Sequence, residues 1–303
     1  MENILASGLL LIDKPPGMTS FEVVRRGRRA LRVKKVGHLG TLDPLATGLL
    51  PLALGEATKL AQFLLEEPKT YLATVRFGVE TDTQDAAGRV VAQTDRLPGE
   101  GEIRRAAAGF QGELLQRPPA YSAVRHEGRR LYKLARQGVE VAPEPRRVVI
   151  HRLEIRELAL PLMTILVECS KGTYVRTLAH DLGQALGCGA HLAALTRLAV
   201  GPFRLEDALP LAQVEEDPEG ALRTGLIPLP ACLPRFRALE VDRRQARRLA
   251  QGQALPWPGN SLAEGEKVRV LSGGDLVAVA MLRSGQSGRE LAPLRVFVAR
   301  VAG

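Results

Sequence analysis

Cysteine is scarce in this chain, which contains only Cys169, Cys188 and Cys232. An odd and scattered set does not describe a disulfide framework, so we expect a reducing compartment. Cys188 and His191 have a C-x-x-H spacing, but no second ligand pair with matching spacing accompanies them. The sequence therefore favours buried structural side chains over a metal site.

Long apolar runs are missing as well. No uninterrupted hydrophobic stretch reaches the roughly 20 residues that a membrane-spanning helix needs. The N-terminus carries Glu2, lacks a basic region and has an apolar run too short for a signal peptide. We therefore expect a cytoplasmic protein with no membrane partner.

The composition that remains is that of a globular chain with a basic surface. Of its 303 residues, 45% are hydrophobic and 25% are charged, which leaves room for one large domain and a small one. The net charge of +9 fits a polyanionic partner. A solvated basic surface without such a partner is the alternative.

Residues 37–48, GHLGTLDPLATG, contain three glycines, a proline and one carboxylate, Asp43. Pro44 disfavours helical backbone at the residue before it, so Asp43 should lie in an extended loop. A loop carboxylate framed by glycines is a candidate for a functional site. An Asp-Pro pair that merely starts a turn is the competing interpretation.

Local patterns predict the elements around this loop. Residues 9–12 form an apolar run typical of a buried strand. Thr19 and Glu22 have capping-box spacing, so a helix should begin there. We expect this helix to bury a stripe made of Phe21, Val24 and Leu31. Seven basic residues follow between Arg25 and Lys35, either as a solvated face or as a grip on phosphates.

Later segments alternate between strand and helix signals. Apolar alternation predicts a strand over residues 71–77, and residues 148–155 and 163–169 also read as strands. Apolar spacing predicts a helix from Thr173 that ends at Gly187, which places Tyr174 and Arg176 in its first turn.

Residues 116–147, the basic segment, combine cationic side chains with interleaved tyrosines. This pattern is typical of a nucleic-acid surface, where cations follow phosphates and rings stack on bases. An ordinary basic loop is the alternative. The segment contains Arg125, His126, Arg129, Arg130, Lys133, Arg136, Arg146 and Arg147, with Tyr121 and Tyr132 among them.

The end of the chain has the signals of a compact β domain. Prolines at 228, 230 and 234 mark a boundary, and Asp242 with Gln245 offers a cap for a short arginine-rich helix. Short strands are predicted over residues 268–271, 276–282 and 296–301, separated by Gly/Ser turns.

Five motifs in order give the chain a family resemblance. They are DKPPGMTS at residues 13–20, GHLGTLDPLATGLLP at 37–51, KTY at 69–71, PPAYSA at 118–123 and CSKGTYVRTL at 169–178. With this order and spacing, the chain resembles the TruB family of tRNA pseudouridine synthases.

The resemblance implies an α+β fold with a central mixed, largely antiparallel sheet flanked by helices and loops. It implies a catalytic domain over residues 1–235, in which the basic segment is an RNA-gripping thumb inserted at about 116–147. A small PUA-like RNA-binding β domain would follow over residues 236–303, with a merely stabilising tail as the alternative.

The resemblance also implies individual roles. Asp43 would be the catalytic carboxylate, Arg176 its bidentate ion-pair partner, and Tyr71 a ring that stacks on the target base. Asp85 would be a polar partner near the site, and His38 would fill the gap left by a flipped base. The remaining residues implied to contact RNA are Lys14, Tyr174, Leu195, Arg125, Arg129 and Arg130. The family often has lysine where this chain has Arg125, and an ordinary core leucine is the rival interpretation of Leu195.

Pseudouridine formation breaks the bond from ribose C1′ to uracil N1, turns the base and joins C5 to C1′. It has no net redox change and imports no group, so it needs neither a cofactor nor a metal. It needs a nucleophile that can add and then leave, which Asp43 can supply. Attack at C6, attack at C1′ and removal of a sugar proton all stay open.

By resemblance the substrate is the T stem-loop of tRNA, at the uridine conventionally numbered 55, and we expect a monomer. A tRNA-folding chaperone whose main role does not depend on catalysis is the alternative function.

Overall fold

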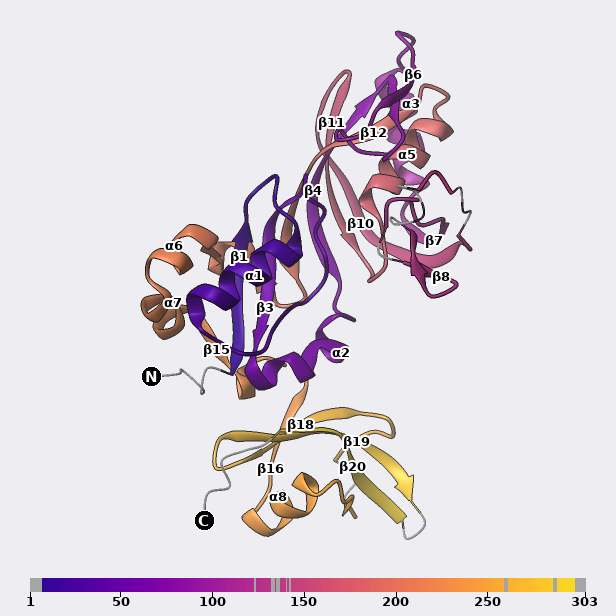
Figure 1. Ribbon diagram of the computed structural model, residues 1–303. Coiled ribbons are helices and arrows are strands. Elements are labelled where there is room, and N and C mark those ends of the chain that lie inside the picture. Colours follow the sequence, from indigo (N-terminus) through magenta and orange to yellow (C-terminus); the bar gives the residue numbers. More distant parts are fainter. Residues whose placement is uncertain are drawn as a thin grey trace.

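The computed structural model describes residues 7–122, 124–131, 134, 137–139, 141, 143–258, 261–285 and 288–297. Figure 1 shows a large body built around one long sheet and a smaller body, drawn in orange and yellow, that contains the C-terminal strands. Each body has its own apolar cluster, and a further cluster joins the two.

The large sheet contains eleven strands within the described residues, and its main path runs β14-β1-β3-β12-β4-β11-β10-β7. Two of its strand pairs, β1 with β14 and β3 with β12, are parallel, and the others are antiparallel. The predicted mixed, largely antiparallel sheet is therefore confirmed. Its strands are β1 (Gly8–Lys14), β2 (Val36–His38), β3 (Thr47–Leu54), β4 (Lys69–Phe77), β7 (Gly112–Gln116), β10 (Arg146–Ala159), β11 (Leu162–Cys169), β12 (Ala190–Val200), β13 (Phe203–Arg204), β14 (Leu209–Pro210) and β15 (Leu226–Pro228).

The order of the sheet places a late strand in its centre. β12 lies between β3 and β4, pairing Arg197 with Gly48 on one side and with Tyr71 on the other. In β4 every second residue from Lys69 is buried, as the apolar alternation predicted. β12 therefore brings the motifs at residues 37–51 and 69–71 to the same part of the sheet.

Helix α1 (Ser20–Leu31) begins where the capping residues predicted. Thr19 is its N-cap, and the Thr19 hydroxyl accepts a hydrogen bond from the Glu22 N–H. The helix buries Val23, Val24 and Leu31. The expected burial of Phe21 is wrong: it is 71% exposed, because it lies about 100° around the helix from Ser20, whose side chain faces inward.

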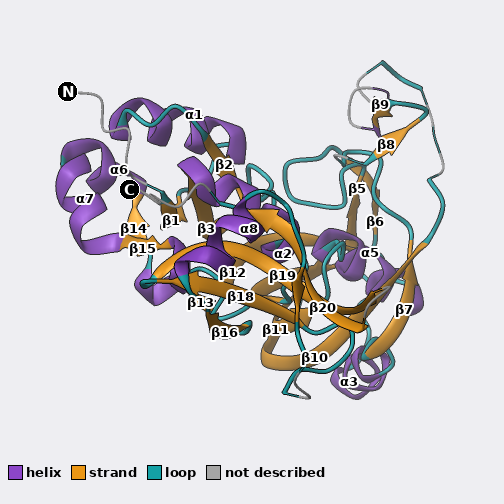
Figure 2. Cartoon of the chain, turned by 90° about the horizontal axis from the view of Figure 1, so that it is seen from below, coloured by secondary structure: helices purple, strands orange, loops and turns teal. Residues whose placement is uncertain are grey.

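Further helices cover the sheet and its ends (Figures 1 and 2). They are η1 (Gly55–Leu60), α2 (Ala61–Leu64), α3 (Glu100–Ala108), α5 (Val175–Ala185), η2 (Leu205–Asp207), α6 (Leu211–Glu216), α7 (Pro218–Gly225) and η3 (Leu229–Ala231). A short ribbon of β5 (Val79–Thr81) and β6 (Val90–Gln93) lies beside α5. None of the helices in the described ranges is long and apolar enough to cross a membrane.

Within the basic segment, β8 (Arg125–His126) and β9 (Arg129–Arg130) form a small hairpin. Glu127 and Gly128 turn it with positive φ angles. Figure 2 shows the hairpin projecting from the body, away from the large sheet. Tyr132, Lys133 and Arg136 lie outside the described residues.

The smaller body has a sheet of β16 (Arg237–Glu240), β17 (Leu255–Pro256), β18 (Lys267–Ser272), β19 (Asp275–Gly285) and β20 (Gly288–Val296), with helix α8 (Arg243–Ala250). The predicted cap is confirmed, since Asp242 and Gln245 form a capping box. Of the third predicted strand, residues 296–301, the structure describes only Val296, which ends β20, and Phe297; the rest lies outside the described residues. β20 occupies Gly288–Val296 because its pairing with β19 begins at Gly288, and charged residues there hide the apolar pattern.

Candidate active site

Asp43 lies in the loop between β2 and β3, outside any helix, as its proline neighbour predicted. The loop is anchored at several points. The Ser20 hydroxyl donates to the Leu42 carbonyl at 2.9 Å and accepts from the Leu42 N–H at 2.8 Å. The Gly17 N–H donates to the Pro44 carbonyl at 2.8 Å. The residues on both sides of Asp43 are therefore fixed, while 36% of the Asp43 side chain remains exposed.

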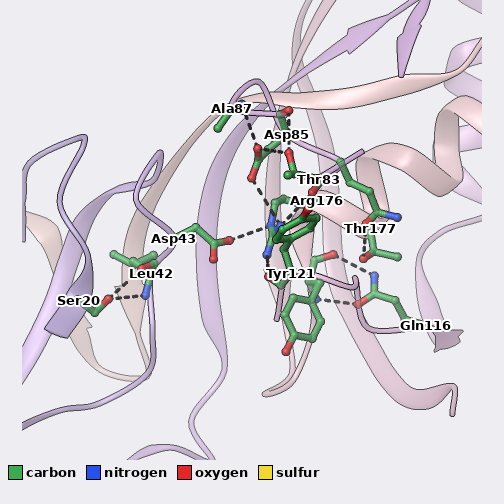
Figure 3. Close-up of polar contacts among 12 residues, drawn as sticks. Ser20, Leu42, Asp43, Thr83, Asp85, Ala87, Gln116, Tyr121, Arg176 and Thr177 are labelled. Atoms are coloured by element: carbon green, nitrogen blue, oxygen red, sulfur yellow. Dashed lines mark hydrogen bonds and ion pairs between the residues drawn. The ribbon is translucent and has the colours of Figure 1, made fainter. Parts of the chain in front are cut away.

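Arg176, near the start of α5, is buried and lies between two carboxylates (Figure 3). Its Nε is 2.9 Å from Asp43 Oδ2, and its Nη1 is 3.6 Å from Asp85 Oδ2. Nη1 also donates to the Thr83 carbonyl and Nη2 to the Tyr121 carbonyl, at 2.9 and 3.1 Å. The implied ion pair with Asp43 is thus present. It is not the bidentate contact that we expected, because both Nη groups face other partners.

Asp85 is held from its own loop. Its Oδ1 accepts hydrogen bonds from the Thr83 hydroxyl at 2.7 Å and from the Ala87 N–H at 3.0 Å. The remaining oxygen, Oδ2, faces Arg176. Asp85 therefore gives the guanidinium a second carboxylate partner besides Asp43.

The environment of Asp43 raises its pKa above the ordinary value of 3.8. Burial is the main cause, and the nearby charge of Asp85 acts in the same direction. The charge of Arg176 is the largest influence that lowers this pKa, and the charge of Lys14 also lowers it. Arg176 therefore favours the ionised carboxylate at a place where burial favours the protonated form.

Two tyrosines lie within electrostatic reach of Asp43, whose charge contributes to raising the pKa of Tyr71 and of Tyr174. Burial is the main cause of both shifts. Tyr71 and Leu195 come from the adjacent strands β4 and β12, and each is 8% exposed. Tyr174 is the N-cap of α5, where its N–H donates to Gln116 Oε1 at 2.7 Å. The structure therefore brings Asp43, Arg176, Asp85 and these tyrosines together.

Lys14 directs its ammonium at backbone carbonyls in and near the Asp43 loop. Its side chain is fully buried, and its ammonium donates to the carbonyls of Ala46 at 2.6 Å and Pro15 at 2.9 Å. A third carbonyl, that of Pro44, accepts at 3.4 Å. Burial lowers the pKa of Lys14 to about 8. The ammonium therefore holds the Asp43 loop through Pro44 and Ala46, and the implied contact of Lys14 with RNA stays a prediction.

His38 ends β2, two residues before Gly40, and is partly buried. Among the described residues its Nδ1 is buried without a hydrogen-bond partner. Burial, followed by the charge of Arg197, lowers its pKa and so favours the neutral ring.

In the hairpin of the basic segment, the structure describes the side chain of one arginine, Arg129. Arg129 is exposed and donates to the side chain of Gln137. Arg125 and Arg130 lie in the hairpin strands, and their side chains are outside what the structure describes. The segment nevertheless meets the site at its base, through the Tyr121 carbonyl that accepts from Arg176.

Arg197 is a residue that the sequence reasoning missed. It is 1% exposed, and its guanidinium donates to the backbone on both sides of the Asp43 loop. The signal that could have found it is a charged residue inside the apolar alternation of β12, since a fully buried arginine needs partners.

Comparisons with known proteins match the chain over most of its length. The model of the "TruB family pseudouridylate synthase (N terminal domain)" matches residues 28–175, and that of the "tRNA pseudouridylate synthase B C-terminal domain" matches residues 176–233. A tRNA pseudouridine synthase B of Burkholderia pseudomallei is 47% identical over 296 residues, covering 96% of this chain and 97% of the relative. One of Aromatoleum aromaticum is 48% identical over 255 residues, covering 84% and 82%.

Solved structures show the same architecture. A chain in the structure of an H/ACA RNP bound to a substrate RNA containing 2′-deoxyuridine matches with a TM-score of 0.75 and 26% identity, covering 98% of this chain and 87% of that one. A chain of a Cbf5-Nop10-Gar1 complex matches with a TM-score of 0.75 and 28% identity, covering 97% and 86%.

Proposed function

We propose that this chain, which belongs to the TruB family of pseudouridylate synthases, converts the T-loop uridine at position 55 of tRNA to pseudouridine with Asp43 as its nucleophile. The chain is thus an RNA-modifying isomerase by family. The observation that carries the proposed mechanism is the 2.9 Å contact between Asp43 and Arg176 in a loop whose carboxylate is partly open to solvent.

The geometry fits a carboxylate that must add to the nucleoside and then leave. Asp43 needs to be ionised to attack, and the buried Arg176 stabilises that form. Thr83, Asp85 and Tyr121 fix the guanidinium, so its charge is in place before the substrate binds. Whether the carboxylate adds to C6 or C1′, or removes a sugar proton, the same preorganised charge serves it.

A uridine inside folded RNA must leave its stack before Asp43 can reach it, at a cost of a few kcal/mol. The position of Tyr71 supports a stacking role for its ring, because the residue lies on a central strand beside Leu195. Tyr174 borders the same space from the start of α5. The neutral ring of His38 suits insertion into the gap that the flipped base leaves, since it adds no charge beside stacked bases.

Binding of the tRNA would be divided among separate surfaces. The projecting hairpin of the basic segment supports a thumb that contacts phosphates through Arg125, Arg129 and Arg130. The second sheet, over residues 237–296, supports a PUA-like RNA-binding domain, with its boundary near residue 235. We also infer a monomer in the cytoplasm, and the three cysteines, all buried and unpaired, agree with a reducing compartment.

The decisive test is pseudouridine mapping on unmodified tRNA with wild-type protein, Asp43→Asn and the matched control Asp207→Asn, which alters an exposed carboxylate far along the chain. We expect conversion at position 55 by wild type and control, and none by Asp43→Asn in a single turnover. Measurable conversion by well-purified Asp43→Asn would overturn the assignment.

The same proteins separate catalysis from RNA folding, since Asp43→Asn should still bind tRNA. If Asp43→Asn refolds misfolded tRNA as well as wild type does, while wild type converts no uridine, the chaperone function replaces the enzymatic proposal.

A further inference from the structure

The Arg197 side chain reaches from the centre of the large sheet to both arms of the Asp43 loop. Its Nε donates to the Leu49 carbonyl at 2.7 Å and its Nη2 to the Gly40 carbonyl at 3.1 Å. Gly40 precedes Asp43 and Leu49 follows it, so one guanidinium spans the loop. Lys14, Ser20 and Gly17 hold the interior of the loop, whereas Arg197 holds its two ends.

The surroundings of Arg197 leave little freedom for another arrangement. Within the described ranges its polar partners are the Leu49 and Gly40 carbonyls and the Tyr71 side chain, and no ion pair joins it to a carboxylate. Gly48 faces it across the β3–β12 pair with φ +93°, and a Cβ there would lie 2.4 Å from the Arg197 carbonyl oxygen. A buried cation is costly without partners, so this one is stable only while both loop arms stay close.

We propose that Arg197 is a positioning residue that clamps the two ends of the Asp43 loop and so places the carboxylate opposite Arg176. The inference rests on the proposed role of Asp43. The clamp requires arginine, because the guanidinium fork of Arg197 directs two donors to two separate carbonyls. Lysine at this place would supply the charge from a single point without the fork.

A second effect of Arg197 is electrostatic. Its charge contributes to the lowered pKa of His38 and opposes the burial that raises the pKa of Tyr71. The residue that clamps the loop therefore also favours the neutral His38 ring beside it. Clamping needs the fork, whereas the effect on His38 needs only the charge, so the two can be separated by substitution.

The test compares Arg197→Lys and Arg197→Met with Arg204→Met, a control that removes an arginine donating to the Gly201 and Phe203 carbonyls outside the loop. In the free protein, we expect both Arg197 variants to exchange amide hydrogens faster over residues 37–48. The His38 pKa, followed by NMR, should rise in Arg197→Met and stay near wild type in Arg197→Lys. With saturating tRNA, single-turnover conversion should fall by about a hundredfold for a displaced carboxylate, while Kd changes little.

Unchanged hydrogen exchange over residues 37–48 in a folded Arg197→Lys protein overturns the clamp, whatever its activity. If Arg197→Met does not fold, Arg197→Lys alone decides, because it retains the buried charge. Faster loop exchange together with full conversion would also contradict the proposal. If the loop loosens but wild-type protein converts no uridine, the clamp stands and the proposed function fails.

Discussion

At the scale of single residues, the pKa of Asp43 makes a prediction about pH. Because the pKa of Asp43 is raised above 3.8 and the ionised form is the proposed nucleophile, the single-turnover rate should fall with decreasing pH around a pKa higher than 3.8. Arg176 lowers this pKa and Asp85 raises it. Arg176→Met should therefore move the acid limb to higher pH, and Asp85→Asn should move it to lower pH. Profiles that shift in the same direction in both variants would contradict the electrostatic roles assigned here.

A second residue-scale prediction concerns Tyr71, whose buried ring we propose to stack on the target base. Tyr71→Phe keeps the stacking face, whereas Tyr71→Leu removes it. We expect Tyr71→Leu to lose about 1–3 kcal/mol of transition-state stabilisation, as stacking contributes elsewhere, and Tyr71→Phe to lose clearly less. Single-turnover rates with saturating tRNA measure both. Equal losses would indicate that the hydroxyl, not the ring face, is required.

At the scale of elements, β3 and β12 lie so close together at Gly48 that no side chain fits between them. An alanine at Gly48 would meet the Arg197 backbone, whereas Gly252, with a similar φ of +82°, has nothing within 4 Å of an added Cβ. Gly252→Ala should lose about 1–2 kcal/mol of unfolding free energy from left-handed backbone alone. Gly48→Ala should lose at least about 1 kcal/mol more through overpacking. Denaturant titrations compare them, and equal losses would mean that the strands can separate freely.

The hairpin of β8 and β9 makes the other element-scale prediction. Arg129→Ala combined with Arg130→Ala should weaken tRNA binding and spare the chemical step at saturating substrate. Each lost phosphate contact should flatten the plot of log affinity against log salt by about 0.7–0.9. Arg104→Ala with Arg105→Ala, on α3, removes the same charge elsewhere and should leave the slope unchanged. A hairpin variant with the wild-type slope would end the thumb hypothesis.

At the scale of the whole molecule, the two bodies share an apolar cluster that also contains the anchors of the active-site loop. Leu39 and Leu49 belong to it, as do Leu276 and Phe297 from the smaller body. Across the junction, Phe63 and Phe236 meet edge to face with centroids 5.8 Å apart. The smaller body therefore packs against the apolar residues Leu39 and Leu49 that flank Asp43 in the chain.

Two leucines of β19 test this coupling, because Leu276 lies in the shared cluster and Leu282 in the core of the smaller body. Both are buried, so each change to alanine should cost about 2–5 kcal/mol of stability. Leu276→Ala alone should also accelerate hydrogen exchange around Leu39 and Leu49. The same acceleration in Leu282→Ala would indicate that general destabilisation, not shared packing, is the cause.

The sequence predicted those features that depend on neighbouring residues or on the family motifs. Proline and glycine placed Asp43 in a loop, capping residues located α1 and α8, and apolar alternation located β4 and β11. Phe21 was misjudged because the neighbouring Ser20 turns inward instead, and the start of β20 was missed because charged residues interrupt its apolar pattern. Arg197 was missed because the carbonyls to which it donates lie about 150 residues away, and the burial of Lys14 likewise depends on carbonyls about 30 residues away.

The place of β12 between β3 and β4 has a consequence for how the chain is made. During synthesis, residues 47–54 and 69–77 leave the ribosome more than a hundred residues before the strand that joins them at 190–200. Until then both strands have an unpaired edge, which is a liability for aggregation that nascent-chain chaperones would need to cover. Arg197 emerges with that same late strand. A polypeptide interrupted before residue 190 would thus carry Asp43 without Arg197, the residue that clamps its loop. The assembled site therefore depends on nearly two thirds of the chain having been translated.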